Sequence, residues 1–396
     1  MSKLEELINE LCPDGVEYKP LGELGEFYGG LSGKSKEDFT EGNAKLITYM
    51  NIFTNLSLNI DVNDNVKIGE NEKQNTVQYG DILFTGSSET PEECGMSSVL
   101  TTKTDELLFL NSFCFGFRPY EKESLLPDFS KYLFRSEELR KQIKRTASGV
   151  TRFNVSKKKM AQVVIPLPPL PVQREIVRIL DNFTELAAEL TAELTARKKQ
   201  YEYYRDELLT FSDESPVSIL GTVAINLDSK RKPVTKGNRD SGMYPYYGAS
   251  GIVDYVSNYL FDGDYLLVSE DGANLVARVT PIAFSASGKI WVNNHAHVLM
   301  FKTYVERKFV EYYLNMIDLS RFISTAAQPK LTQDNLNKIP VPTPSLEEQE
   351  RIVAILDRFD ALCNDLTSGL PAEIEARRKQ YEYYRDRILT FKEKVA

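Results

Sequence analysis

The chain of 396 residues is 42% hydrophobic and 27% charged, and its formal net charge at neutral pH is −9. This length is long for one core and suits two or more domains of ordinary globular composition. The acidic balance lowers the odds of a nucleic-acid binder without excluding one, because local basic patches matter more than the sum.

The first residues and the cysteines bear on the compartment. The opening stretch MSKLEELINELC is charged and amphipathic, unlike a signal peptide. No stretch reaches the roughly 18 apolar residues of a spanning helix, so we expect no membrane segment. The four cysteines are scattered without CxxC spacing, which argues against a disulfide framework and a structural zinc site. We therefore expect a cytoplasmic protein.

Residues 1–164 have the mixed texture of a globular α/β domain. The segment NSFCFGFRP alternates as a strand does, and FSKYLFRSEELRKQIKR is typical of a helix. GGLSGKS, at 29–35, imitates a phosphate-binding P-loop, but that pattern requires glycine where Tyr28 stands. We favour contact of Lys34 and Lys36 with a phosphate backbone over nucleotide binding.

Residues 165–215 predict a proline hinge followed by a long helix. IPLPPLP favours extended backbone, and one helix over 173–211 would be about 58 Å long at about 1.5 Å per residue. The apolar positions step by four and three, which is typical of a coiled coil, and only Arg197 interrupts them. The alternative is an amphipathic helix lying on a globular core. The predicted seam is Ile176, Leu180, Phe183, Ala187, Leu190, Leu194, Tyr201, Tyr204, Leu208 and Phe211.

Residues 216–338 predict a second α/β domain, with HAHVLMFK as a strand and ERKFVEYYLNMIDLSRFI as a helix. Its histidines, His295 and His297, are the only two in the chain and are spaced to share one face of a strand. We interpret them as a packed or DNA-facing pair rather than metal ligands, because no further ligand set is evident nearby.

Residues 339–396 repeat the hinge and the helix. Ser345 and Glu348 have the spacing of a capping box, and the seam continues through Leu356, Phe359 and Leu366. An insertion at TSGLP adds four residues to the period. We expect a kink or break there, with the helix starting again near Pro371.

Both helical regions contain nearly the same string, RKKQYEYYRD at 197–206 and RRKQYEYYRD at 377–386. The globular domains share only a frame, such as GDILF and GDYLL. The chain is therefore a tandem duplication. We predict two globular α/β domains separated by two long coiled-coil helices and related by a pseudo-two-fold axis, which makes the helices antiparallel. A scaffold that stays alike while its heads differ suggests that the heads recognise two different things.

The proline hinge, the EEQ and REIV helix starts and the repeated RKKQYEYYRD string resemble the specificity subunit of Type I restriction-modification systems, over essentially the whole chain. The resemblance implies that each head is a target recognition domain for one half of a bipartite, asymmetric site in double-stranded DNA. It also implies that the helices dock two methyltransferase subunits, which restriction and translocase subunits join. S-adenosylmethionine, ATP and magnesium would belong to those partners, with no cofactor in this chain.

Candidate contacts are basic and polar loop residues, because Lys and Arg bind phosphates and Arg also pairs with guanine. Exposed Tyr and Arg of the repeated string are candidates for partner contact, since both residue types are frequent at interface hot spots. For any single residue, ordinary solvation is an alternative. The DNA candidates are Lys34, Lys36, Ser87, Ser88, Arg145, Thr151, Arg152, Lys230, Arg231, Lys232, Lys236, Arg239, Arg278, Lys289 and Lys330, and the partner candidates are Tyr203, Arg205, Tyr383 and Arg385.

No methyltransferase motif of the NPPY type and no GxGxxG after a strand is found, so we expect a chain that does not catalyse. The first alternative is a two-headed adaptor or scaffold that binds protein rather than DNA. A self-contained nuclease or methyltransferase is the other.

Overall fold

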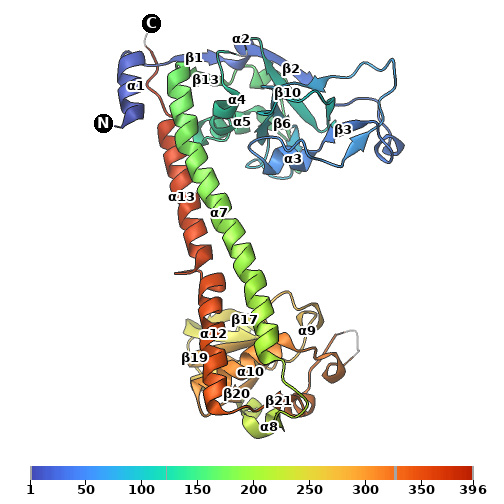
Figure 1. The fold of residues 1–396 in the computed structure, drawn as a ribbon, viewed down its shortest axis with the longest axis vertical. Helices are drawn as coiled ribbons and strands as arrows, with labels where there is room; N and C mark the ends of the chain where they lie inside the picture. Colours follow the sequence, from blue (N-terminus) through green and yellow to red (C-terminus); the bar gives the residue numbers. More distant parts are fainter. Residues whose placement is uncertain (1, 122, 325–327, 395–396) are drawn as a thin grey trace. The chain divides into compact units, whose positions relative to one another are not determined.

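The computed structural model describes residues 2–121, 123–324 and 328–394. The chain divides into two compact units, which we call unit 1 (Met1–Glu189 with Ile374–Ala396) and unit 2 (Leu190–Glu373). Each unit contains a globular head and parts of both long helical regions (Figure 1). The units divide inside the helices because each part of a helix packs on the core of its own head.

The head of unit 1 packs small sheets against short helices. The central sheet has the order β2-β10-β6-β8, the second β4-β3-β9-β5 and the third β11-β12-β7, while β1 pairs with β13. Phe84, Phe117 and Phe129 are fully buried in the core. The strands are β1 Glu17–Pro20, β2 Gly25–Gly29, β3 Ala44–Ile47, β4 Asn65–Val66, β5 Thr76–Val77, β6 Ile82–Thr85, β7 Ser87–Ser88, β8 Ser97–Val99, β9 Leu108–Leu110, β10 Cys114–Pro119, β11 Ala147–Ser148, β12 Phe153–Val155 and β13 Val164–Leu167; the helices are α1 Lys3–Leu11, α2 Leu21–Leu24, α3 Tyr49–Thr54, α4 Pro127–Leu133, α5 Glu137–Thr146 and α6 Lys157–Met160, with a 3-10 turn at Lys36–Phe39.

The head of unit 2 is built on one larger sheet of order β15-β20-β18-β19-β16-β17, with a separate pair β14-β21. Leu266, Val268 and Phe309 are buried in its core. The strands are β14 Val217–Ile219, β15 Ile225–Asn226, β16 Ser241–Gly248, β17 Gly251–Val256, β18 Phe261–Ser269, β19 Ala283–Val292, β20 Ala296–Met300 and β21 Pro340–Pro342; the helices are α8 Leu220–Val223, α9 Asn274–Ala277, α10 Tyr304–Met316 and α11 Gln333–Asn337, with 3-10 turns at Asp228–Lys230, Lys236–Asn238 and Ser320–Phe322.

The first helical region is the single helix α7, Leu170–Leu209. It begins three residues earlier than predicted, because a proline is tolerated in the first turn of a helix. Ile176 and Leu180 of the predicted seam are fully buried. Among the described residues, no helix combines the length and apolar content that crossing a membrane requires.

The second helical region is interrupted, as predicted. Helix α12 spans Leu346–Asn364 and α13 spans Leu370–Ile388. The predicted seam is wrong at Leu366, which is 79% exposed, because it lies in the interruption rather than in a helix. Ser345 caps α12 by accepting the N–H of Glu348, but the Glu348 side chain pairs with Arg351 instead of completing the box.

The two helical regions pair through equivalent aromatic contacts. In unit 1, Phe183 stacks on Tyr384 with ring centroids 5.5 Å apart, and in unit 2, Tyr204 stacks on Phe359 at 5.7 Å. From Phe183 to Tyr204 the position along α7 advances, while the paired position in the second region goes back from Tyr384 to Phe359. The two helical regions therefore pair antiparallel, as predicted.

Each head is fastened to the helical region by the same kind of bond. The hydroxyl of Tyr132 on α4 donates to Asp181 on α7 at 2.6 Å, and the hydroxyl of Tyr312 on α10 donates to Asp357 on α12 at 2.6 Å. Asp181 and Asp357 occupy the same position of the repeat. The duplication therefore extends from the sequence to the side-chain contacts.

Candidate nucleic-acid interface

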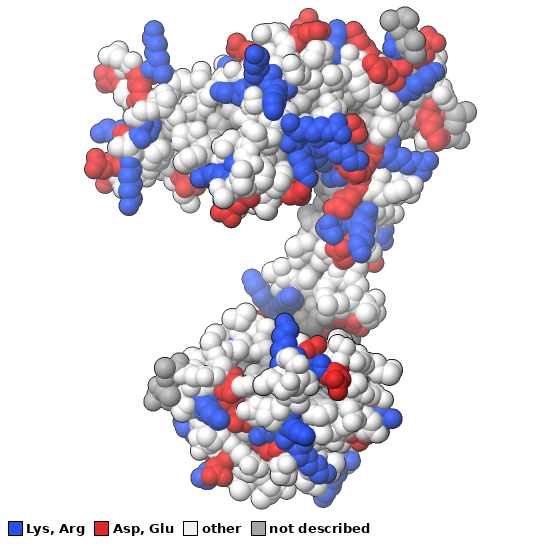
Figure 2. Space-filling view, turned by 180° about the vertical axis from the view of Figure 1, so that it is seen from behind, with Lys and Arg blue, Asp and Glu red and all other residues white. Residues whose placement is uncertain are grey.

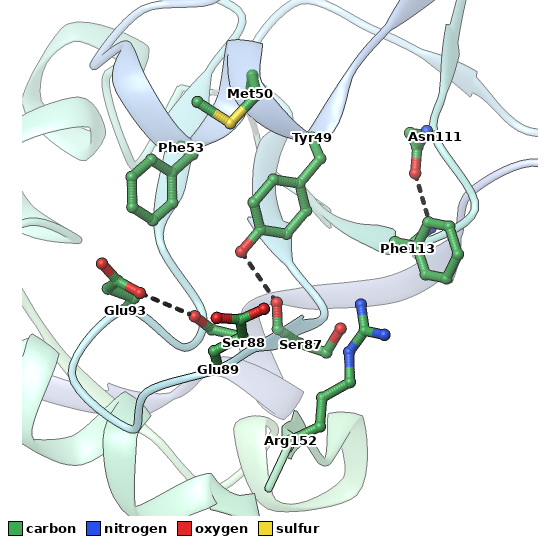
Figure 3. A pocket seen from close by; sticks show the side chains of 10 residues that line it. All are labelled: Tyr49, Met50, Phe53, Ser87, Ser88, Glu89, Glu93, Asn111, Phe113 and Arg152. Carbon is green, nitrogen blue, oxygen red and sulfur yellow. Dashed lines mark hydrogen bonds between the residues drawn. The ribbon is translucent and has the colours of Figure 1, made fainter. Parts of the chain in front are cut away.

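A pocket of about 370 Å³ opens on the head of unit 1 (Figure 3). It brings together the predicted residues Ser87, Ser88 and Arg152. Tyr49 and Phe53 of α3 form an aromatic wall, with ring centroids 6.0 Å apart and planes at 17°. The pocket is lined by Tyr49, Met50, Phe53, Ser87, Ser88, Glu89, Glu93, Asn111, Phe113 and Arg152.

Hydrogen bonds fix several of these side chains (Figure 3). The Tyr49 hydroxyl donates to the carbonyl of Ser87 at 2.9 Å, and the Ser88 hydroxyl donates to Glu93 at 3.2 Å. The Arg152 guanidinium lies over the Phe113 ring, 5.7 Å from its centroid. These contacts hold the side chains of the pocket walls in place.

The other predicted residues of unit 1 differ in availability. The Lys34 ammonium donates to Glu72 at 2.5 Å and its side chain is only 8% exposed, so its charge is already neutralised. Two hydrogen bonds lower the pKa of Glu72 to about 2, the larger effect coming from the backbone N–H of Gly69 and the next from the Lys34 ammonium. Lys36, Arg145 and Thr151 are exposed.

In unit 2, the predicted basic segment alternates exposed and anchored residues. Lys230, Lys232 and Lys236 are exposed. Arg231 instead binds Glu270 at 2.6 Å, and Arg239 binds Asp254 at 3.0 Å and lies over a tyrosine ring. The two arginines are therefore engaged in holding the segment on the head, whereas the three lysines are exposed to solvent.

The remaining DNA candidates of unit 2 also differ in how far their side chains are exposed and paired. Arg278 has left-handed backbone, with φ of 52°, and donates to the carbonyls of Leu314 and Ile317 at the end of α10, which is a structural role. Lys330 is half exposed and pairs with Glu270 at 3.0 Å. Lys289 is exposed and lies over the ring of a tyrosine.

A buried charged cluster surrounds His297. Its Nδ1 lies 2.5 Å from Asp228 and its Nε2 lies 2.8 Å from the carbonyl oxygen of Leu331, so both ring nitrogens face oxygen acceptors. Asp228, Glu270 and His297 have the mutual spacing of metal ligands. Arg231 pairs with both carboxylates, which explains the cluster as an ion-pair network. His295 is half exposed and contacts Asp271 at 2.9 Å.

The partner candidates occupy equivalent surface positions in the two helical regions. Tyr203 and Tyr383 are 63% and 61% exposed. Arg205 and Arg385 are less exposed, and each pairs with the aspartate that follows it. The tyrosines are therefore available for a partner, whereas the arginines are engaged within the chain.

On the face shown in Figure 2, Lys and Arg are interspersed with Asp and Glu on each unit. Charge on this face therefore does not mark out a binding surface. Sequence reasoning missed Tyr49, Phe53, Glu89, Asn111 and Phe113, which line the pocket with Arg152. They come from separate segments without a basic motif, so only their proximity in the fold reveals them.

The family described as the Type I restriction modification DNA specificity domain matches the chain twice, at residues 13–197 and 217–376. A type I restriction enzyme specificity subunit of Haemophilus influenzae is 36% identical over 269 residues, which cover 62% of this chain and 68% of that protein. The EcoR124I/EcoR124II specificity subunit of Escherichia coli is 36% identical over 267 residues, covering 60% and 64%.

A solved structure from work on complex assembly in the type I R-M system has the same fold. It aligns with a TM-score of 0.60 at 17% identity and covers 95% of this chain and 97% of that chain. The duplicated heads, the paired helices and the double family match lead to one conclusion: the chain belongs to the family of Type I restriction-modification specificity subunits.

Proposed function

We propose that this chain is a non-catalytic subunit that recognises a bipartite, asymmetric DNA target, one half with each head. The observation that carries the proposal is that heads of different sheet topology are fastened to the same helical scaffold by equivalent Tyr–Asp bonds. Conserving the fastening while changing the head lets two unlike sequences be read by one chain.

The repeated helical surface supports docking of two copies of one methyltransferase subunit, through which restriction subunits would join. S-adenosylmethionine, ATP and magnesium belong to these partners in our proposal. The chain then supplies the sequence preference, and the partners supply adenine methylation or cleavage.

A reconstitution tests the proposal. The purified chain alone should neither methylate nor cleave DNA, and adding a cognate methyltransferase subunit should produce methylation of a single two-part motif. Activity of the isolated chain would support an enzyme instead. A complex without any sequence preference would support a protein-binding adaptor.

Replacing the exposed repeat tyrosines tests the docking of two partners. Tyr203→Ala and Tyr383→Ala should each weaken one of the two methyltransferase sites by about 2 kcal/mol, the loss typical of an interface hot spot. Native mass spectrometry should then show complexes with one methyltransferase copy. Tyr120→Ala, at another exposed tyrosine, is the control and should retain two copies. Two copies in all three variants would place the interface elsewhere.

A further inference from the structure

The pocket on unit 1 contains opposite charges that do not neutralise each other. Glu89 and Arg152 both line it (Figure 3), yet within the described part of the chain neither charged group forms an ion pair or a hydrogen bond. Arg231 and Arg239 of unit 2, in contrast, are paired with carboxylates. The pocket therefore offers both a charged donor and a charged acceptor to a ligand.

We infer that this pocket reads one G·C pair in the major groove, with Arg152 donating to guanine and Glu89 accepting from the amino group of cytosine. In that groove, guanine presents the acceptors O6 and N7, and cytosine presents its N4 amino donor. The inference rests on the proposed function and names the residues with which the first head specifies its half-site.

The charges of the pocket select a base edge over the phosphate backbone. Glu89 and Glu93 line the same pocket, so it contains two carboxylates as well as the arginine. A phosphate entering the pocket would be repelled by both, whereas an amino group donates to a carboxylate. Phosphate contacts are left to exposed basic residues that do not line the pocket, such as Lys36 and Arg145.

The rim of the pocket is apolar and exposed. Met50 is 57% and Phe113 59% exposed. Such side chains exclude water when a base edge enters, and hydrogen bonds are stronger where water is excluded. Because Phe113 also lies under the Arg152 guanidinium, it orients the donor before DNA arrives, which lowers the entropic cost of binding.

Two half-buried arginines hold the walls in place. Arg135 donates to the carbonyls of Ile52 and Phe53, at 2.9 and 3.0 Å, and so caps the end of α3. Arg140 donates to the carbonyl of Cys94 at 2.7 Å, next to Glu93. Burial lowers the pKa of Arg135 to about 10, so it remains charged at neutral pH. A fixed wall is what discrimination between base pairs requires.

The test uses the chain complexed with its methyltransferase and a DNA library in which both half-sites are randomised. Glu89→Gln should reduce discrimination at one C position about 10-fold or more, and Arg152→Lys should do the same at the paired G. The half-site read by the second head should be unchanged in both variants. Glu41→Gln removes an exposed carboxylate of the same head outside the pocket and should leave the motif unaltered.

The outcomes separate this inference from the function on which it rests. If the wild-type complex has no sequence preference, the proposed function fails. If it has a two-part motif but the first half-site lacks a G·C pair, or both pocket variants leave that half-site unchanged, the pocket is not the reading surface. If Glu89→Gln loses sequence discrimination at both half-sites, that variant is unfolded. The effect of Arg152→Lys on the half-site of the first head then decides whether the pocket reads it.

Discussion

The tyrosines that fasten each head to the helices are a matched pair for mutation. Tyr132→Phe and Tyr312→Phe each remove one partly buried hydrogen bond to a carboxylate, which should lower the free energy of unfolding by about 1–2 kcal/mol. Hydrogen exchange should increase in α4 for the first variant and in α10 for the second, without crossing between units. Tyr120→Phe, at a residue 64% exposed, is the control. Unchanged exchange in both variants would show that the bonds add nothing.

The buried cluster of unit 2 makes stability depend on acid. Burial raises the pKa of Asp228, but the hydrogen bond with His297 and the nearby Arg231 outweigh it, so the pKa lies below its usual value of 3.8. The ionised carboxylate therefore stabilises the fold at neutral pH, and this contribution is lost as the pH falls through the unfolded and then the folded pKa.

Asp228→Asn should lower the free energy of unfolding by about 3 kcal/mol at pH 7, because it removes the buried carboxylate that both Arg231 and the His297 ring contact. The difference from the wild type should shrink below about pH 4, where the unfolded wild-type carboxyl is itself protonated. Urea unfolding of both proteins at pH 7 and at pH 3 measures this difference. A difference that stays constant down to pH 3 would contradict the assigned role.

Single residues show where sequence reasoning reaches its limit. It marked Arg152, Arg231 and Arg278 alike as DNA candidates, because residue type and local context are similar. The fold separates them: Arg231 pairs with Glu270, 39 positions away, as well as with nearby Asp228, and Arg278 caps a distant helix. Burial and pairing depend on contacts between remote segments, which no local pattern contains.

The interruption of the second helical region depends on a glycine. A Cβ atom at Gly369 would lie 2.5 Å from the carbonyl oxygen of Ala361 and 2.8 Å from that of Asp365. Gly369→Ala should therefore force the backbone apart and destabilise unit 2 by about 1–3 kcal/mol. Leu366→Glu, at the exposed tip, should change stability by less than about 0.5 kcal/mol. Thermal unfolding compares the stability of the two variants. Equal stability would show that the turn accommodates a Cβ atom at residue 369.

Elements with a sustained period were predicted well from the sequence. The four-three spacing predicted α7, because helix periodicity is local and repeats many times. Of its seam, Ile176 and Leu180 are fully buried, whereas Tyr204 is 38% exposed. The short strands of the heads and helix α3, which forms the aromatic wall of the pocket, carry no such signal. The scaffold was therefore predictable to within a few residues, whereas the candidate reading surface was not.

For the whole molecule, the duplication is expressed as equivalent contacts at the scaffold and as differences at the heads. Phe183 with Tyr384 and Phe359 with Tyr204 exchange the same residue types between the two helical regions. The heads keep the equivalent strand pairs β1-β13 and β14-β21 but differ in their main sheets. The scaffold contacts are thus shared between the two units, whereas the main sheet is particular to each head.

The length of α7 should set the distance between the half-sites. The segment 187–196 reads AAELTAELTA, in which the four residues AELT occur twice. It includes the point where unit 1 passes into unit 2. Inserting one more AELT repeat lengthens the helix by about 6 Å and rotates its following part by about 40°. The stacked pairs at Phe183 and Tyr204 lie on either side of the insertion, so each unit retains its own contacts.

We expect such an insertion to change the permitted spacer by about two base pairs, at about 3.4 Å per pair, while both half-sites stay the same. The second helical region passes from unit 2 to unit 1 just after its interruption, at Glu373, so the added length can be taken up there. Methylation of a library with variable spacers measures the effect, and Glu189→Gln, which preserves length, is the control. An unchanged spacer would mean that α7 does not measure the distance, and altered half-sites would mean that the heads are not independent readers.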